Sequence, residues 1–402
     1  MRIVHTSDWH LGKKLYRASR IDEQHLFLTW LSDYLITNKV DILLISGDVF
    51  DVPTPPNEAL KHYFNFLKEL TTKSHIQIFI IGGNHDSSHF LEAPSPFLKL
   101  SGIHVIGNLT EFIKGNIEPY LKEVTIAGET TTIVMLPYFR THELYNLGKK
   151  WDIDPELGLL PVIEKCLSIM SDSASGKKIL MAHHLFGSYE ESGSEQGLSL
   201  SGIDSIPTAI LEDFDYVALG HIHKAQTLRK ETPIIHYSGS PMSFRFSETT
   251  TKTMSQIEIS NGKLTNELIE IKQFDKLLRV NCNYQDLDIY KDEVISSWKD
   301  QSDIKVYLEM KVKTSEPIAS LAEKLREEFS ENGITLLSFQ TIVIDNSEKE
   351  EEEHFLEKSL RTEELFDMYY KKKYPESEEV PRPLREDFYS LLESVRGDLD
   401  EA

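Results

Sequence analysis

The hydrophobic positions in the first quarter of the chain alternate between two periods. Short apolar runs at 2–6, 41–46 and 76–81 consist of β-prone residues that suit buried strands. Two longer stretches lie between them, at 21–37 and 57–70, and their apolar residues recur at helical spacing. This strand-helix-strand-helix-strand order predicts right-handed crossovers and a sheet that is covered on both faces.

Beyond Ile103 the pattern becomes mostly strand-like, which predicts a second sheet packed on the first. Residues 185–205 are polar and rich in Gly and Ser, which is typical of a surface loop, and their position in the chain predicts that they border the functional site. The expected strands lie at 123–126, 131–136, 178–182, 216–219, 234–238 and 254–259.

The chain restarts near residue 275 with another alternation of periods. Strand-like runs at 276–283, 304–312 and 335–344 enclose helical stretches at 286–299 and 318–329. This order predicts a small β-α-β-α-β domain.

From Glu348 the composition becomes acidic, and two helix-like stretches follow at 354–373 and 384–395. Each carries an apolar stripe that a short helix cannot bury alone. The stripes either pack on their own domain or form a docking element for a partner helix. The expected fold class is α/β, with two packed mixed β-sheets flanked by helices, a smaller α/β domain and a helical C-terminal tail. The expected domains are 1–275, 276–345 and 346–402.

The composition narrows the class of protein. The chain has 402 residues, of which 40% are hydrophobic, so two or three domains with buried cores are expected. Its net charge of −22 gives no long-range attraction to nucleic acid, so a surface that binds DNA must be local or come from a partner. Two cysteines in no metal-like spacing predict no disulfide framework and a reducing cytoplasm. The sequence predicts no signal peptide and contains no apolar stretch long enough to span a membrane.

Five of the expected strands are each followed, within a few residues, by side chains that can bind metals. They are Asp8, His10, Asp48, Asn84, His183, His221 and His223. Within the pairs at 8 and 10 and at 221 and 223, the residues stand two apart, so on an extended chain both members point to the same side. The carboxyl ends of strands are also where open α/β sheets place their ligands. One choice stays open because His184 adjoins His183, and we prefer His183 because it directly follows the run 179–182.

These donors predict two divalent ions side by side. A set of nitrogen and oxygen ligands without thiolate suits Mn, Fe or Zn better than Ca or Mg. The two oxygens of Asp48 can bridge the ions, and such a pair, about 3.5–4 Å apart, can polarise a phosphoryl group and activate water for in-line attack. A free imidazole at His85 could protonate the leaving oxygen or stabilise the transition state. The sequence therefore predicts hydrolysis of a phosphate ester.

The segments around these residues resemble the calcineurin-like metallophosphoesterase superfamily, and within it the branch of DNA double-strand-break repair nucleases. The resemblance is strong over 1–275, and the domain at 276–345 is similar to the family's capping domain in the order of its elements. The tail is similar to the family's docking region in position. The segments that carry the branch resemblance are His-Thr-Ser-Asp-Trp-His-Leu-Gly at 5–12, Gly-Asp-Val-Phe-Asp at 47–51 with Pro-Pro at 55–56, Ala-Leu-Gly-His-Ile-His-Lys-Ala-Gln at 218–226 and Tyr-Ser-Gly-Ser-Pro at 237–241.

The resemblance implies a ligand set for each ion and a role for His85. In this pattern His85 binds no metal and serves as the proton donor or transition-state histidine. Archaeal and eukaryotic relatives carry a second such histidine where this chain has Asp51. The implied sets are Asp8, His10, Asp48 and His223 for one ion and Asp48, Asn84, His183 and His221 for the other.

The resemblance also implies an activity and a partner. The activity is that of a Mn²⁺-dependent nuclease, with 3′→5′ exonuclease action on double-stranded DNA ends and endonuclease action on single strands or hairpins, in DNA end processing, repair and recombination. The implied partner is an ATPase with a coiled coil that receives the helices after residue 350, in a heterotetramer that contains a dimer of this chain.

Basic residues beside the first metal motif are candidate contacts to DNA, because lysine and arginine neutralise phosphates locally. The alternative is a solvated helix start. The candidates are Lys13, Lys14, Arg17 and Arg20, with Arg245 in addition.

Two other hypotheses about function stay open. One is a metallophosphoesterase that acts on small nucleotides or phosphoproteins, although a small substrate needs neither the domain beyond 275 nor the apolar tail. The other is a scaffold with an inactive site, which the intact set of metal-binding residues disfavours.

Overall fold

The computed structural model describes residues 1–195, 205–299, 304–315, 318 and 320–343, together with 366, 370, 373, 374, 380, 381, 384, 385 and 388. The chain divides into two compact units. The first comprises Met1–Val312 and Ala319–Gln340, and the second comprises Lys313–Ile318 and Thr341–Ala402. The expected domain boundaries at 275 and 345 stay predictions, and the tail helices expected at 354–373 and 384–395 lie mostly outside the described residues.

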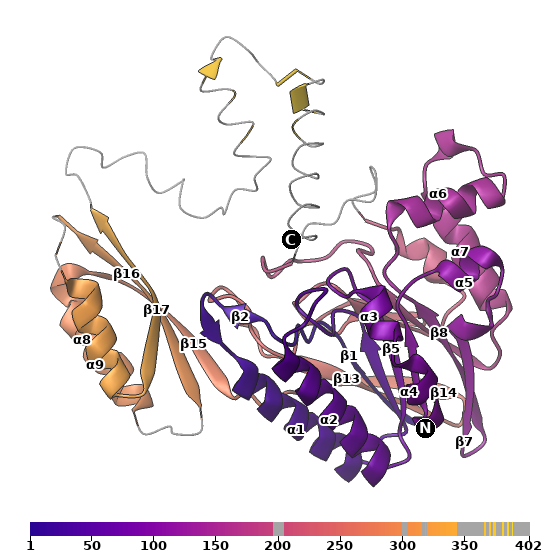
Figure 1. The fold of residues 1–402 in the computed structure, drawn as a ribbon, viewed down its shortest axis with the longest axis horizontal. Helices are drawn as coiled ribbons and strands as arrows, with labels where there is room; N and C mark the ends of the chain where they lie inside the picture. Colours follow the sequence, from indigo (N-terminus) through magenta and orange to yellow (C-terminus); the bar gives the residue numbers. More distant parts are fainter. Residues whose placement is uncertain are drawn as a thin grey trace. The chain divides into compact units, whose positions relative to one another are not determined.

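The first sheet has the strand order β14-β13-β1-β4-β5-β6. Its strands β1, β4, β5 and β6 run parallel, while β13 and β14 pair antiparallel at one edge. The long helices α1 and α2 lie side by side over the sheet (Figure 1). The elements are β1 (Arg2–Thr6), α1 (Ile21–Thr37), β4 (Ile42–Ser46), α2 (Asn57–Lys73), β5 (Gln77–Ile81), α3 (Ser88–Glu92), α4 (Ser95–Leu98), β6 (Ile103–Ile106), β13 (Thr253–Ser260) and β14 (Lys263–Glu270).

The second sheet has the order β11-β12-β10-β9-β8-β7, and its four middle strands are parallel. All six strands expected beyond Ile103 are present, but the one at 254–259 is β13 and joins the first sheet. Two helices in this part of the chain, α6 and α7, were not predicted. Both helices are amphipathic, with apolar faces such as that formed by Leu144 and Leu147 in α6. The elements are α5 (Thr110–Lys114), β7 (Leu121–Ile126), β8 (Glu129–Leu136), α6 (Thr141–Lys150), α7 (Leu160–Asp172), β9 (Lys177–His183), β10 (Tyr216–Gly220), β11 (Gln226–Arg229) and β12 (Ile234–Tyr237).

Alternation along β4 explains why the two sheets pack together. Ile42 and Leu44 belong to the core shared with the second sheet, whereas Leu43 and Ile45 belong to the core under α1 and α2. All four side chains are completely buried. A strand that is apolar on both faces can be covered on both, as in parallel sheets between layers. The predicted class of two packed mixed sheets flanked by helices is confirmed.

A third sheet has the order β15-β16-β17. Its chain order, β15-α8-β16-α9-β17, is the β-α-β-α-β order expected from the sequence, and α8 and α9 lie together along it (Figure 1). The bounds are β15 (Asp275–Asn283), α8 (Leu287–Trp298), β16 (Lys305–Thr314), α9 (Leu321–Glu331) and β17 (Ile334–Val343).

A short hairpin of β2 (Lys14–Leu15) and β3 (Ala18–Ser19) follows the first metal motif. Its tip residue Tyr16 donates a hydrogen bond of 2.8 Å to Glu309 of β16. Single turns of 3₁₀-helix complete the fold at Lys99–Ser101, Glu118–Tyr120, Pro155–Leu157, Thr208–Leu211 and Tyr284–Asp286. In the described part of the chain, no helix is long and apolar enough to cross a membrane.

Candidate metal centre

The predicted ligands come from the carboxyl ends of parallel strands in both sheets. Strand β4 of the first sheet lies against β9 and β10 of the second. The Ser46 hydroxyl at the end of β4 donates a hydrogen bond of 3.0 Å to the Ala218 carbonyl of β10, which ties the two edges together. Asp8 and His10 follow β1, Asp48 follows β4, Asn84 follows β5, His183 ends β9, and His221 and His223 follow β10.

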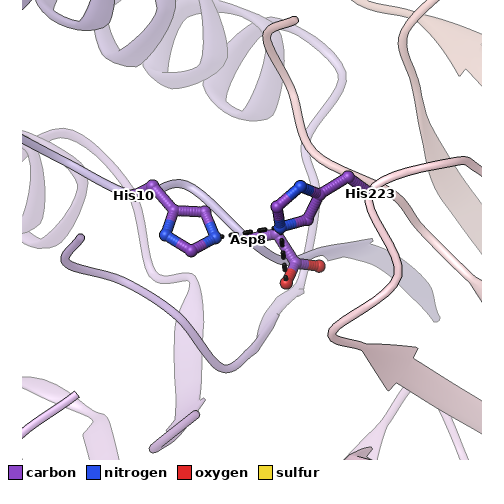
Figure 2. Close-up of side chains that lie close together, drawn as sticks. All are labelled: Asp8, His10 and His223. Atoms are coloured by element: carbon purple, nitrogen blue, oxygen red, sulfur yellow. Dashed lines mark hydrogen bonds and ion pairs between the residues drawn. The ribbon is translucent and has the colours of Figure 1, made fainter. Parts of the chain in front are cut away.

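Asp8, His10 and His223 form what we name the first cluster, and all three are buried. The Nε2 atoms of His10 and His223 lie 3.0 Å apart, and His223 Nε2 lies 4.0 Å from an Asp8 oxygen. Figure 2 shows the two imidazoles facing one another, with the Asp8 carboxylate below His223. The backbone N–H of His221 donates to the Asp8 carboxylate at 2.9 Å, which fixes its position.

Asp48, His183 and His221 form the second cluster, and Asn84 joins it. The Asn84 side-chain oxygen lies 3.1 Å from His183 Nε2 and 3.0 Å from His221 Nδ1. The Nδ1–H of His183 donates to the Ser46 carbonyl at 2.8 Å. Because that bond uses Nδ1, the lone pair on Nε2 faces the cluster, as a metal-binding tautomer requires.

Asp48 belongs to the second cluster and also faces the first. Its Oδ2 is 3.5 Å from His10 Nε2 and 3.3 Å from His183 Nε2. Its Oδ1 accepts a hydrogen bond of 2.9 Å from the backbone N–H of His85. One carboxylate oxygen is thus held by backbone while the other is directed at imidazoles of both clusters.

Unusual backbone conformations place these side chains. Asp8, His10, Asp48 and His221 have φ angles of 53°, 45°, 51° and 93°, in the left-handed region that non-glycine residues seldom adopt. Such conformations concentrate at functional sites, where the surrounding structure offsets their cost of roughly 1–3 kcal/mol each.

Close backbone approaches require glycine beside the ligands. A Cβ at Gly83 would lie 2.1 Å from the Asp48 carboxylate, and one at Gly47 would lie 2.2 Å from the His183 ring. The carboxylate of Asp86 accepts hydrogen bonds from the backbone N–H groups of Val49, Phe50 and Gly83, and so joins the β4 and β5 loops. Both glycines and Asp86 therefore serve the packing of these loops around Asp48.

The charges in the site suit divalent cations. The ion-pair partners of Asp8 and Asp48 are histidines. Burial, reinforced by the charge of Asp48, raises the pKa of Asp8 to about 7. Burial lowers the pKa of His183, but the Asp48 carboxylate outweighs it and the pKa rises to about 9. Without cations, Asp8 and His183 thus hold protons more tightly, whereas the histidines around Asp48 outweigh its burial and lower its pKa well below the usual range. A divalent ion binds such ligands in their deprotonated form. The donor set fits divalent metals.

His184 and His85 stay outside both clusters. His184 Nε2 accepts a hydrogen bond of 3.1 Å from the backbone N–H of Phe139, and its ring stacks on Tyr138. Of the two adjacent histidines, the structure therefore brings His183 to the site. The Nδ1–H of His85 donates to the carbonyl of Asp51 at 2.8 Å, and its ring packs edge-on against His10 with centroids 4.7 Å apart.

Other residues hold the first cluster in place, and no sequence pattern indicates most of them. The Asp51 carboxylate lies 3.4 Å from His10 Nδ1 and 2.5 Å from the Lys13 ammonium. The Phe244 ring packs edge-on against both His10 and His223, with centroids 5.1 and 5.2 Å away. Phe244 follows Tyr-Ser-Gly-Ser-Pro at 237–241, one of the segments that carry the family resemblance, so its neighbourhood was the available clue.

The five basic residues proposed to contact DNA lie in different surroundings. Lys14 and Arg17 are exposed on the hairpin, as is Arg245 beyond it, and Lys13 is partly exposed. Arg20 is only 2% exposed and pairs with the buried Asp275 at 2.6 Å. Because it is buried, Arg20 is corrected from a DNA contact to a structural anchor of β15. Removing one partner from a buried ion pair costs roughly 3–5 kcal/mol.

A model of the calcineurin-like phosphoesterase family matches residues 1–225. The match covers more than half of the chain, so the chain belongs to this family. Together, the family match and the acid and histidine clusters indicate that the chain binds divalent metal.

Two relatives are similar over longer stretches. The chain is 33% identical over 259 residues to the SbcD subunit of the SbcCD nuclease of Bacillus subtilis. The matched region covers 62% of this chain and 63% of that protein, so the chain spans less than two thirds of the length of that relative. It is 27% identical over 352 residues to the corresponding SbcCD nuclease subunit of Staphylococcus epidermidis, with 87% of each protein covered. Among solved structures, a dimetal phosphatase from Danio rerio is similar with a TM-score of 0.40 and 11% identity, covering 68% of this chain and 98% of that one.

Proposed function

We propose that this chain is a metal-dependent DNA nuclease that cleaves phosphodiester bonds as the SbcD-type component of an SbcCD-type complex. The observation that carries the proposal is the pair of clusters on either side of Asp48 in a calcineurin-like phosphoesterase. The similarity to nuclease subunits extends over 352 residues in the Staphylococcus relative, well beyond the 1–225 of the family model. A small-ester phosphoesterase would not need that shared extension.

The first ion would be held by the first cluster with Asp48, and the second ion by the second cluster with Asn84. Asp48 supports this assignment, since its Oδ2 lies within 3.5 Å of imidazole nitrogens from both clusters. Nitrogen and oxygen donors without sulfur suit Mn²⁺, Fe²⁺ or Zn²⁺, and the resemblance to the nuclease branch favours Mn²⁺ among them. When bound, the ions would supply positive charge for the phosphoryl oxygens and activate the attacking water.

His85 would then act on the phosphoryl group and on the leaving oxygen of the substrate. The backbone N–H of His85 bonds to Asp48, and its Nδ1–H bonds to the Asp51 carbonyl, so its ring is fixed while Nε2 stays available to the substrate. From there, His85 would stabilise the charge that develops on the phosphoryl group or deliver a proton to the leaving 3′ or 5′ oxygen, a step worth about 10²–10⁴-fold in rate.

Contacts to DNA and to a partner complete the proposal. Lys14 and Arg17, on the exposed hairpin next to the first cluster, would meet phosphates of the strand, and the partly exposed Lys13 lies between that hairpin and His10. The proposed partner is an SbcC-type ATPase with a coiled coil, bound through the tail after residue 346, in a heterotetramer with two copies of this chain. The proposed activities are 3′→5′ exonuclease on duplex ends and endonuclease on single strands and hairpins, in DNA repair and recombination in the cytoplasm.

The decisive experiment compares cleavage of two substrates and then measures the effect of adding the ATPase partner. The purified chain with Mn²⁺ is given a labelled DNA hairpin and, separately, a p-nitrophenyl phosphodiester. We expect hairpin cleavage that Asp48→Asn abolishes, and ATP-dependent digestion of blocked duplex ends once the ATPase is added. The nuclease proposal would be contradicted if the chain cleaves only the small ester and leaves the hairpin intact, whether or not the ATPase is present.

A further inference from the structure

A short segment, residues 190–195, contacts the backbone and side chain of His223 through its last two residues. The Ser194 hydroxyl is 2.5 Å from His223 Nδ1. One carboxylate oxygen of Glu195 accepts a hydrogen bond of 2.8 Å from the backbone N–H of His223. Two adjacent residues, 28 and 29 positions before the histidine, thus contact both its ring and its main chain.

The segment is itself fixed, so these contacts are not those of a loose loop. The Glu195 carboxylate also accepts from the backbone N–H groups of Ser192 at 3.0 Å and Gly193 at 2.8 Å. At its other end, the main chain of Glu190 exchanges two hydrogen bonds with the side chain of Gln226, at 2.9 and 2.8 Å. The segment is therefore anchored to the strand that follows His223 and closes on itself through Glu195.

Ser194 occupies Nδ1 of His223, so the nitrogen that faces the first cluster is Nε2. When the Ser194 hydroxyl accepts the Nδ1–H, the lone pair of the neutral ring lies on Nε2 and can bind an ion. That is the nitrogen 3.0 Å from His10 Nε2 and 4.0 Å from Asp8. On the other side, the Phe244 ring packs against the imidazole and limits its rotation. The partner on the second nitrogen commonly sets the tautomer and orientation of a metal-binding histidine.

We propose that Ser194 and Glu195 are positioning residues of the metal centre, which hold His223 in the tautomer and orientation that bind the first ion. This inference rests on the proposed function, because it takes His223 as a metal ligand. It assigns a role to part of the Gly- and Ser-rich stretch 185–205, which the sequence predicted only to border the site.

The test is a calorimetric titration of the full-length chain with Mn²⁺ at fixed pH, which resolves the affinity for each ion without reference to cleavage. We expect Ser194→Ala and Glu195→Gln each to weaken one of the two ions by about 10–100-fold and to leave the other unchanged. Ser194→Thr keeps a hydroxyl and should restore binding to within a few-fold of the unaltered chain. Glu190→Gln is the matched control, since its carboxylate pairs with the surface Lys224 and not with His223.

The outcomes separate this inference from the proposed function. If His223→Ala loses one ion while Ser194→Ala and Glu195→Gln bind both ions within about twofold of the unaltered chain, the positioning role is overturned and the metal centre stands. If the unaltered chain binds no Mn²⁺, both proposals fall. A loss of affinity in Glu190→Gln equal to that in Glu195→Gln also overturns the inference, because the effect would then belong to the loop in general.

Discussion

The two clusters of the site are built from the same residue types but are held in different ways. In the second cluster, His183 is oriented by the carbonyl of Ser46, an atom of the β4 main chain. In the first cluster, the rings of His10 and His223 are held by side chains, those of Asp51, Ser194 and Phe244. A main-chain support survives substitution of its residue, whereas a side-chain support does not. His183 is therefore fixed by the fold, whereas the rings of the first cluster can be tuned by single substitutions.

The largest effect should come from the residue that both clusters share. Asp48→Asn keeps the shape of the side chain but removes the charge beside His10 and His183, so we expect both ions to bind much more weakly. Hydrolysis of hairpin DNA should fall by about 10³-fold or more, since several kcal/mol of transition-state stabilisation are lost. Calorimetry with Mn²⁺ and cleavage assays measure this, and the exposed Asp154→Asn serves as the control. Loss of only one ion would show that Asp48 does not bridge.

His85→Ala tests whether a residue beside the clusters can be removed without affecting metal binding by either. His85 touches Asp48 through its backbone N–H, which alanine retains. We expect both Mn²⁺ ions to bind with unchanged affinity while the turnover rate on hairpin DNA falls by about 10²–10⁴-fold. Weakened metal binding in this variant would instead make His85 a ligand.

Asp51→Asn should affect metal binding by the two clusters differently. The substitution removes the charge near His10 Nδ1 and the ion pair with Lys13, but it keeps the backbone carbonyl to which His85 donates. We expect the affinity for one Mn²⁺ to fall by about 10–100-fold while the other is unchanged. The matched control is Asp213→Asn at an exposed position. An equal decrease at both ions would contradict the division into side-chain and main-chain supports.

The clusters should also respond differently to pH, with the smallest effect of the four. Asp8 and His183 must lose their protons to bind a cation, and their pKa values are raised to about 7 and about 9. Affinity for the first ion should therefore rise as the pH increases to about 7 and then level off, while affinity for the second should keep rising towards 9. Each proton displaced changes affinity by at most about tenfold per pH unit. Titrations at several pH values measure this, and parallel curves for both ions would contradict it.

Most of the fold followed from local patterns, and the exceptions are informative. The five strands that precede the ligands were predicted because each is a short apolar run bounded by glycine or polar residues, as in 41–46 before Gly47. The helices α6 and α7 were missed although Leu144 and Leu147, and Cys166 and Met170, have helical spacing. Their periodicity is present, but it lies in a region where the neighbouring strand-like runs give the stronger pattern.

The supports of the site were beyond a reading of the sequence. Arg20 looked like one of four similar basic residues, and only its burial against Asp275 distinguishes it. Ser194, Glu195 and Phe244 lie 20 or more residues from their histidine partners or in polar stretches without periodicity, so no local pattern indicates what they contact. The left-handed conformations of Asp8 and Asp48 likewise depend on the loops packed around them.

The sequence by itself determined which residues could bind metal and that each would stand at the end of a strand, because strand and ligand are neighbours in the chain. The expectation that a period of two sets which side the ligand pairs face was wrong, because Asp8, His10 and His221 have left-handed rather than extended backbone. Only the tertiary structure decided which nitrogen of each histidine faces the site and which residues hold the rings. These features depend on contacts such as that between Ser46 and His183, 137 residues apart, and on the packing of one sheet against the other. Such contacts form only when the whole core is assembled.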